Sequence, residues 1–133
     1  MTRLERVGEL ITELGHDALL VSAPSNIRYL TGFTGSTGYL LVQRDGSAVA
    51  VTDSRYAERI AEETHGVDLT IRIAPVAGRK VLAELLGDGA LGVEADVLSW
   101  AEVQGLQRLL SNDRVHATTG AVSYTHLTLP TKA

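Results

Sequence analysis

Residues 25–38 read SNIRYLTGFTGSTG, and this stretch decides how the rest of the chain is interpreted. It follows Pro24, and a Pro-Ser pair at this point predicts the end of a strand and the capped start of a short helix. Behind that helix, glycine recurs every third residue, at Gly32, Gly35 and Gly38. Glycines at this density allow backbone angles that other residues resist, and they leave N–H groups open to a ligand or a neighbouring chain.

Two side chains of this stretch are candidates for function. Phe33 stands in the middle of the glycine segment and must be buried, either in the core of its own domain or at an interface or substrate pocket. Arg28 on the short helix can present a fork of donors to a carboxylate, and the alternative is a surface ion pair of little energetic consequence. A phosphate site is not favoured, because GFTGSTG lacks the Walker lysine and the GxGxxG spacing.

The composition limits the class of protein. The chain has 133 residues, 44% hydrophobic and 21% charged, which is typical of one globular domain. Its net charge is −4 and no run of Lys or Arg forms a basic stripe, so nucleic acid is not an expected partner. The absence of cysteine excludes disulfides, a zinc ribbon and a thiol nucleophile. There is no secretory signal or membrane-length apolar run, so we expect a cytoplasmic protein without a membrane partner.

Hydrophobic periodicity predicts alternating helices and strands. Besides the short helix after Pro24, helices are expected at residues 2–14, 53–64, 78–86 and 99–110. Strands are expected at residues 17–22, 38–44, 46–52, 67–73, 90–94 and 113–117. The Asp45-Gly46 pair between two apolar runs predicts a β-hairpin. This order favours an α/β fold, with a mixed β-sheet flanked by helices and a hairpin within it.

Capping signals mark the starts of three helices. Thr2 with Glu5 and Ser99 with Glu102 each match a capping box, while Asp53 or Ser54 is expected to cap the helix that begins there. Asp53 also stands where a catalytic acid could stand, but an N-cap is the commoner role at a strand-to-helix junction. For the helix after Ser99 we expect an inward face of five residues: Trp100, Val103, Leu106, Leu109 and Leu110.

Other chemistry is scarce in the sequence. None of the four histidines pairs with a second histidine or a flanking glutamate at helical spacing, so no helical metal site is expected. A GxSxG nucleophile elbow is also absent.

The C-terminal residues differ from the rest. Residues 122–131 read VSYTHLTLPT, which resembles one reading frame of the transposon-end adapter used to prepare sequencing libraries, with Lys132 and Ala133 as further read-through. We therefore expect residues 1–120 to be the natural domain and residues 121–133 to be a non-native tail. The alternative is a natural threonine-rich C-terminus.

The central stretch and its surroundings resemble a known family. GHDALLVSAPSNIRYLTGFTGSTGYLLV at residues 15–42, VTDSRYAERIAEE at 51–63 and LGVEADVLSWAE at 91–102 follow one another as in the N-terminal domain of Xaa-Pro aminopeptidases, prolidases and creatinase. The likeness is greatest to the bacterial Xaa-Pro peptidases and runs from about residue 1 to 119. Ser54 stands where many relatives have glycine, which is a mild departure.

This resemblance implies a two-domain parent protein. Its N-terminal domain would have a ribonuclease-H-like fold, and its C-terminal pita-bread domain would hold two divalent metal ions, manganese or cobalt. Two Asp, one His and two Glu would bind these metals. Those ligands would lie beyond Ala121, so no catalytic or metal-binding residue is assigned in this chain, and no cofactor is expected in it.

The resemblance also implies roles for particular residues. The N-terminal domain would pack against its own catalytic domain and a second subunit, in a homodimer or a tetramer of dimers, and would close over the neighbour's active site. Arg28, Tyr29 and Phe33 would then rim the neighbour's pocket for a short proline-containing peptide. A structural motif is expected at six other positions: Asn26, Gly32, Gly35, Asp53, Arg55 and Tyr56.

The expected function is therefore that of a non-catalytic N-terminal domain of a metal-dependent Xaa-Pro aminopeptidase. Such a hydrolase cleaves the peptide bond before proline, and this chain alone is expected to be inactive. Two alternatives stay open. One is the same domain of a prolidase or a creatinase-like amidinohydrolase, and the other is a free-standing binding module without enzymatic activity.

Overall fold

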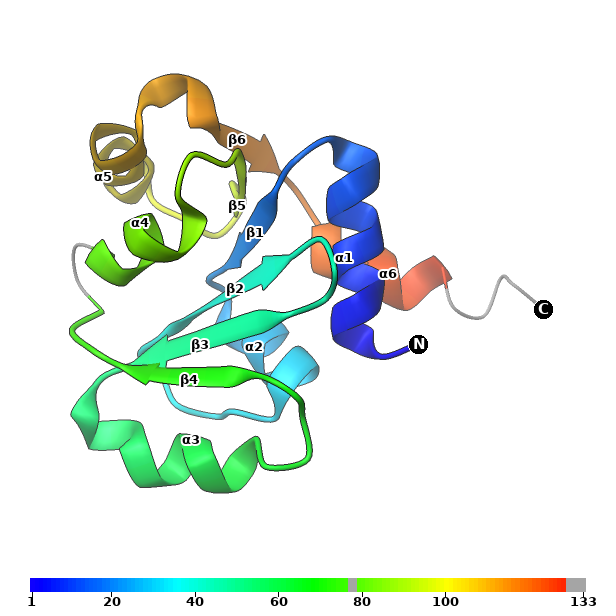
Figure 1. Cartoon of the computed structure of the whole chain (residues 1–133), viewed down its shortest axis with the longest axis vertical. Helices are drawn as coiled ribbons and strands as arrows, with labels where there is room; N and C mark the ends of the chain where they lie inside the picture. Colours follow the sequence, from blue (N-terminus) through cyan, green and yellow to red (C-terminus); the bar gives the residue numbers. More distant parts are fainter. Residues whose placement is uncertain (77–78, 129–133) are drawn as a thin grey trace.

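The computed structural model describes residues 1–76 and 79–128, within which six strands form a single mixed sheet (Figure 1). Their order across the sheet is β4-β3-β2-β1-β5-β6. Strand β2 is antiparallel to both β1 and β3, whereas the pairs β1–β5, β5–β6 and β3–β4 are parallel. The strands are β1 (Ala18–Val21), β2 (Tyr39–Gln43), β3 (Ala48–Thr52), β4 (Thr70–Ile73), β5 (Leu91–Glu94) and β6 (Val115–Thr118).

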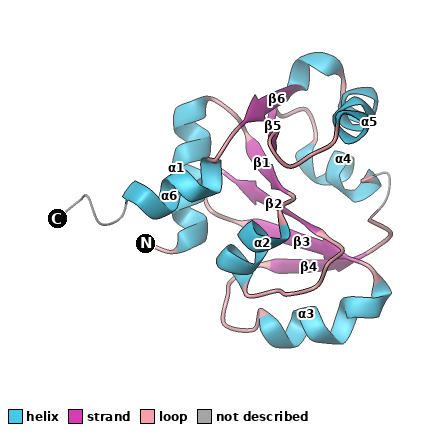
Figure 2. Ribbon diagram, turned by 180° about the vertical axis from the view of Figure 1, so that it is seen from behind, coloured by secondary structure: helices cyan, strands magenta, loops and turns pink. Residues whose placement is uncertain are grey.

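Helices cover both faces of this sheet (Figures 1 and 2). One face carries α1 (Arg3–Leu14), α2 (Pro24–Thr31), α3 (Ala57–Glu63) and α6 (Ala121–Thr128), and the other carries α4 (Lys80–Leu86) and α5 (Trp100–Leu110). Short 3₁₀ turns, η1 (Ser54–Tyr56) and η2 (Asn112–Arg114), precede α3 and β6. The expected α/β fold with a mixed, helix-flanked sheet is confirmed.

Alternation along the strands gives each face its own core. In β1, Leu19 and Val21 pack with α1 and α2, while Ala18 and Leu20 pack with α4 and α5. All four of these side chains are buried. Because successive side chains of a strand point to opposite faces, a central strand covered on both sides must be apolar at every position.

Three of the local signals form as the sequence predicts. In each capping box the hydroxyl accepts from the N3 amide at 3.1 Å, as Thr2 does from Glu5 and Ser99 from Glu102. The hairpin turns at Gly46, whose φ of 86° suits glycine. A side chain at Gly46 would also meet the backbone of Glu5 at 2.9 Å, so this glycine lets α1 lie against the hairpin.

Other expectations need correction. The helix after β1 is not capped by Ser25, because its N-cap is Ala23, which offers no side-chain hydrogen bond. Strand β4 begins at Thr70, three residues later than expected. Trp100 is 71% exposed, so its assignment to the core was wrong, and Leu109 on the same helix is exposed as well. Gly78, the expected start of the fourth helix, lies outside the described residues.

The chain after Gly120 continues as α6, which lies beside α1 (Figures 1 and 2). Its first two residues, Ala121 and Val122, are buried in the same core as α1, whereas Ser123 and Tyr124 are exposed. That residues 121–133 are a non-native tail stays a prediction, and residues 129–133 lie outside the described residues.

Candidate functional site

The helix α2 occupies the junction from which the candidate residues project. Pro24 is its first residue, and Gly32 ends it with a φ of 88° and an N–H that donates to the Arg28 carbonyl at 2.8 Å. A side chain at Gly32 would meet the Glu63 carbonyl at 2.8 Å, so glycine also allows α2 to end close against α3. The apolar face of α2, with Ile27 and Leu30, is buried against the sheet.

A carboxylate from a distant strand closes the start of α2. Glu94, at the end of β5, is only 4% exposed. Its Oε1 accepts from the backbone N–H groups of Ser22 and Ala23 at 2.5 and 2.8 Å, and its Oε2 accepts from Asn26 Nδ2 at 2.5 Å. The predicted structural role of Asn26 is thus a side-chain bond to Glu94, a partner that local sequence patterns did not indicate.

Arg28 and Tyr29 lie at the other end of α2. Arg28 is exposed, and within the described residues it forms no hydrogen bond or ion pair. Tyr29 is half-buried, and the guanidinium of Arg3 lies 4.1 Å from its ring centroid. Arg3 Nη1 also donates to the Tyr29 carbonyl at 2.6 Å, so the first turn of α1 holds the last turn of α2.

A cleft of about 800 Å³ opens beside these two residues. Its walls come from the first turn of α1, the end of α2, the β2–β3 turn and the segment before β4. Arg28 and Tyr29 line it, and so do the carboxylates of Asp45 and Asp68. The cleft therefore presents a cation, an aromatic ring and carboxylates to a ligand or to another chain.

Phe33 is buried in the core of its own domain. Its ring is 2% exposed and meets the ring of Tyr56 edge-on, with centroids 5.8 Å apart. A side chain at Gly35 would enter the space of this ring, with Phe33 Cε1 only 2.7 Å away. Gly35 is therefore needed because the loop folds over Phe33, and the ring takes the first of the two positions that the sequence left open.

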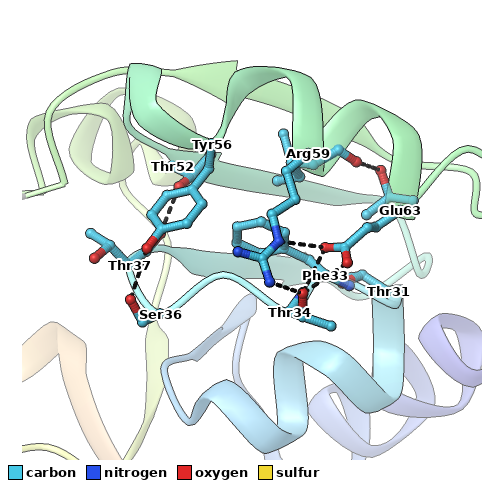
Figure 3. Close-up of polar contacts among 11 residues, drawn as sticks. Thr31, Phe33, Thr34, Ser36, Thr37, Thr52, Tyr56, Arg59 and Glu63 are labelled. Carbon is cyan, nitrogen blue, oxygen red and sulfur yellow. Dashed lines mark hydrogen bonds and ion pairs between the residues drawn. The ribbon is translucent and has the colours of Figure 1, made fainter.

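The rest of the glycine loop is bonded to α3 and η1 (Figure 3). The Thr34 N–H donates to Glu63 Oε1 at 2.9 Å, and its hydroxyl contacts both Glu63 oxygens. Arg59 Nη2 donates to the Thr34 hydroxyl at 2.6 Å. Further along, the hydroxyls of Ser36 and Tyr56 lie 2.9 Å apart. These bonds hold the loop in one conformation, and those from Thr34 lower the pKa of Glu63.

The TDSRY segment has the capping role that the sequence favoured for Asp53. Asp53 Oδ1 accepts from the Arg55 N–H at 3.0 Å, and Oδ2 accepts from the Arg55 guanidinium at 2.7 Å. Hydrogen bonds from Arg55 lower the pKa of Asp53, which favours the carboxylate over the acid. Arg55 also reaches the Thr37 hydroxyl at 3.3 Å, and so links this junction to the glycine loop.

Neither a cluster that could hold a metal ion nor a helix that could span a membrane occurs among the described residues. No three acidic or histidine side chains there lie close enough together to hold a metal ion. His16 and His116 stack with their ring centroids 4.9 Å apart, and neither of them lines the cleft. No helix in the described ranges has the length and apolar character that crossing a bilayer requires.

The structure brings the predicted residues together in two groups. Asn26, Arg28 and Tyr29 share α2, while Gly35, Phe33 and the TDSRY segment form one packed unit with α3. Sequence reasoning missed Glu94 and Glu63, which connect these groups to the fold. Helical periodicity alone would place Glu63 on a solvated face of α3, and its 2.9 Å hydrogen bond from the Thr34 N–H shows a different role.

Known proteins resemble this chain in sequence and in fold. The curated "Uncharacterized peptidase YqhT" of Bacillus subtilis is 37% identical over 67 residues, which are 50% of this chain and 19% of the relative. The N-terminal domain of cytoplasmic peptidase PepQ from Mycobacterium tuberculosis H37Rv has a TM-score of 0.79 at 32% identity, covering 92% of this chain and 97% of that one. X-Pro aminopeptidase from Thermotoga maritima has a TM-score of 0.80 at 26% identity, covering 95% of this chain but only 36% of that one.

This chain therefore spans about a fifth of its curated relative and a third of the Thermotoga enzyme. The family model for the Creatinase/Prolidase N-terminal domain matches residues 3–124, and the chain belongs to this family.

Proposed function

We propose that the chain is the non-catalytic N-terminal domain of a metal-dependent Xaa-Pro aminopeptidase. In the parent enzyme two divalent metal ions in a C-terminal domain would activate the water that attacks the peptide carbonyl. The parent would act in the cytoplasm, since its relative PepQ is described as a cytoplasmic peptidase. The natural domain would end at about Gly120, with the parent sequence continuing in place of residues 121–133.

The observation that carries this proposal is the position of Arg28 and Tyr29 on the wall of the cleft beside α2. In a homodimer this end of α2 would face the neighbour's active site. An unpaired guanidinium and a half-buried aromatic ring suit the carboxylate and the apolar side chains of a short peptide. Phe33 would contribute by supporting the loop beneath this rim, since its ring is buried within the domain.

The loop beside α2 suits a rim for a second reason. It is held by Glu63, Arg59 and Tyr56 rather than left open, so it would not have to be ordered when a peptide binds. Preorganised contact surfaces lose less conformational entropy on binding.

The first test is to sequence the source gene beyond the codon for Gly120 and to express the complete protein. We expect metal-dependent cleavage of the bond before proline in tripeptides, lost with a chelator. In that enzyme Arg28→Ala should raise KM about tenfold through loss of a charge-assisted bond, with little change in kcat. The matched control is Arg108→Ala, which removes an exposed arginine from α5.

Each result has a clear meaning. Cleavage of dipeptides alone would assign the parent to the prolidases, and hydrolysis of creatine would assign it to the amidinohydrolases. A parent lacking the two Asp, one His and two Glu ligands would overturn the enzyme proposal in favour of a binding module. An equal effect of Arg28→Ala and Arg108→Ala would overturn the rim role of Arg28.

A further inference from the structure

Glu94 is the most deeply buried carboxylate that the proposed function leaves without a task. It is 4% exposed, although no cation lies among its bonded partners. Those partners are three N–H donors from one short segment: the backbone amides of Ser22 and Ala23 and the side-chain amide of Asn26. A carboxylate without such donors would be very costly to bury at this depth, so the site requires all three.

The segment that Glu94 binds cannot complete its own helix start. The N-cap of α2 is Ala23, which has no side-chain acceptor, and Pro24 follows it. Elsewhere in the described residues α1 and α5 use a local Ser or Thr with a Glu three residues later. At α2 the equivalent carboxylate comes from β5, which lies beside β1 in the sheet. The start of α2 is thereby fixed to strand β5 of the sheet instead of to a residue of its own first turn.

We propose that Glu94 is a positioning residue for the rim that α2 presents, acting through Asn26 and the backbone of Ser22 and Ala23. This inference rests on the proposed function for its consequence in catalysis. Its structural part can be tested on the 133-residue chain alone. The helix has eight residues, so a shift at its start carries Arg28 and Tyr29 with it.

The sharpest test exchanges the two polar groups. Asn26→Asp places a second carboxylate where Asn26 Nδ2 lies 2.5 Å from Glu94 Oε2, and the two like charges repel. Adding Glu94→Gln restores complementarity, because the new amide can donate to Asp at position 26 while its oxygen still accepts from Ser22 and Ala23. The double variant should therefore recover what the Asn26→Asp variant loses.

The readout is amide hydrogen exchange, residue by residue. In Asn26→Asp the amides of Ile27 and Gly32 should exchange at least about tenfold faster, while Leu41 in central β2 changes less than about twofold. If Asn26→Asp does not fold, Glu94→Gln alone replaces it, with about threefold faster exchange confined to α2. The control is Glu102→Gln, the same chemical change at the carboxylate that caps α5.

These outcomes separate a positioning role from general stability. Faster exchange in α2 and β2 alike, or no rescue in the double variant, would overturn the proposal. In the complete enzyme, Glu94→Gln should raise KM with kcat nearly unchanged, and Glu102→Gln should leave both as they are. If the complete protein cleaves no peptide, the proposed function fails while the exchange result on α2 still stands or falls by itself.

Discussion

At Gly35, the ring of Phe33 occupies the space that a side chain would need. The position is not one of unusual backbone angle, so the demand for glycine is purely steric. We expect Gly35→Ala to displace the ring and to lower the free energy of unfolding by about 1–3 kcal/mol, as overpacking of a core does. Urea unfolding measures this change.

The matched control for this substitution is Gly105→Ala on α5. A side chain there meets nothing within 4 Å, and alanine favours the helix, so this variant should gain about 0.5–1 kcal/mol. Equal effects of the two substitutions would contradict the packing of Phe33 beneath the loop.

His16 makes the stability of the fold depend on pH, in a direction that its surroundings determine. Desolvation lowers its pKa below 6.5, the charges of His116 and Arg44 lower it further, and Asp17 opposes them. The fold therefore prefers the neutral ring. Its contribution to stability is complete above pH 6.5 and is lost as the pH falls below that value, because the unfolded chain then binds more protons.

The urea concentration at the unfolding midpoint should accordingly decrease as the pH is lowered from about 7.5 to about 5.5. The His16→Asn substitution should make this decrease smaller. His65→Asn is the control, since His65 is exposed and bonded only to the Glu62 carbonyl. The carboxylates whose pKa is lowered, such as Glu63 and Asp53, titrate at more acidic pH than the histidine does, below their usual pKa values. Identical slopes in the two histidine variants would contradict the role of His16.

Among the elements, the glycine loop and α3 form one unit through Glu63. Replacing Glu63 by Gln removes one acceptor of the Thr34 contacts and the 3.7 Å ion pair with Arg59. We expect the Thr34 amide to exchange several-fold faster, with little change in the free energy of unfolding, because these groups are exposed. Glu62→Gln, one residue earlier on the exposed side, should change neither quantity.

The elements also show what sequence patterns can and cannot predict. Local signals are sufficient to predict α1, the hairpin and the start of α5. The reason is that Thr2, Gly46 and Ser99 each act within a few residues of their partners. The cap of α2 was not predictable, because its acceptor lies about 70 residues away at Glu94. Helical periodicity alone also predicts that Trp100 faces the core, but only one face of α5 meets the sheet and Trp100 lies outside it.

The same distinction applies to the candidate site. Asn26, Arg28 and Tyr29 could be selected from the sequence because they share one short helix beside a glycine loop. The burial of Phe33 could not be decided, since it depends on how the loop folds back against Tyr56. Glu63 was missed for the same reason, because a helix pattern does not reveal which loop passes over it.

For the molecule as a whole, the single tryptophan reports on an exposed apolar surface at the start of α5. Trp100 is 71% exposed and Val97 nearby is 41% exposed. The wavelength of maximum fluorescence emission should therefore lie close to that of tryptophan in water, and iodide should quench this fluorescence efficiently. A blue-shifted, protected emission in a monodisperse sample would contradict this exposure or show that copies of the chain cover it.

The bonds from Glu94 to the start of α2 span 68 to 72 residues of sequence. During synthesis from the N-terminus, β1 to β4 can pair before residue 94 has left the ribosome, since each of these strands pairs with its neighbour in sequence. In that interval the start of α2 lacks the acceptor that Glu94 supplies in the complete fold. The helix α2 would thus be synthesised early but would receive its N-terminal cap late in folding. The time that it spends without this cap would be set by the rate of translation rather than by its own helix propensity.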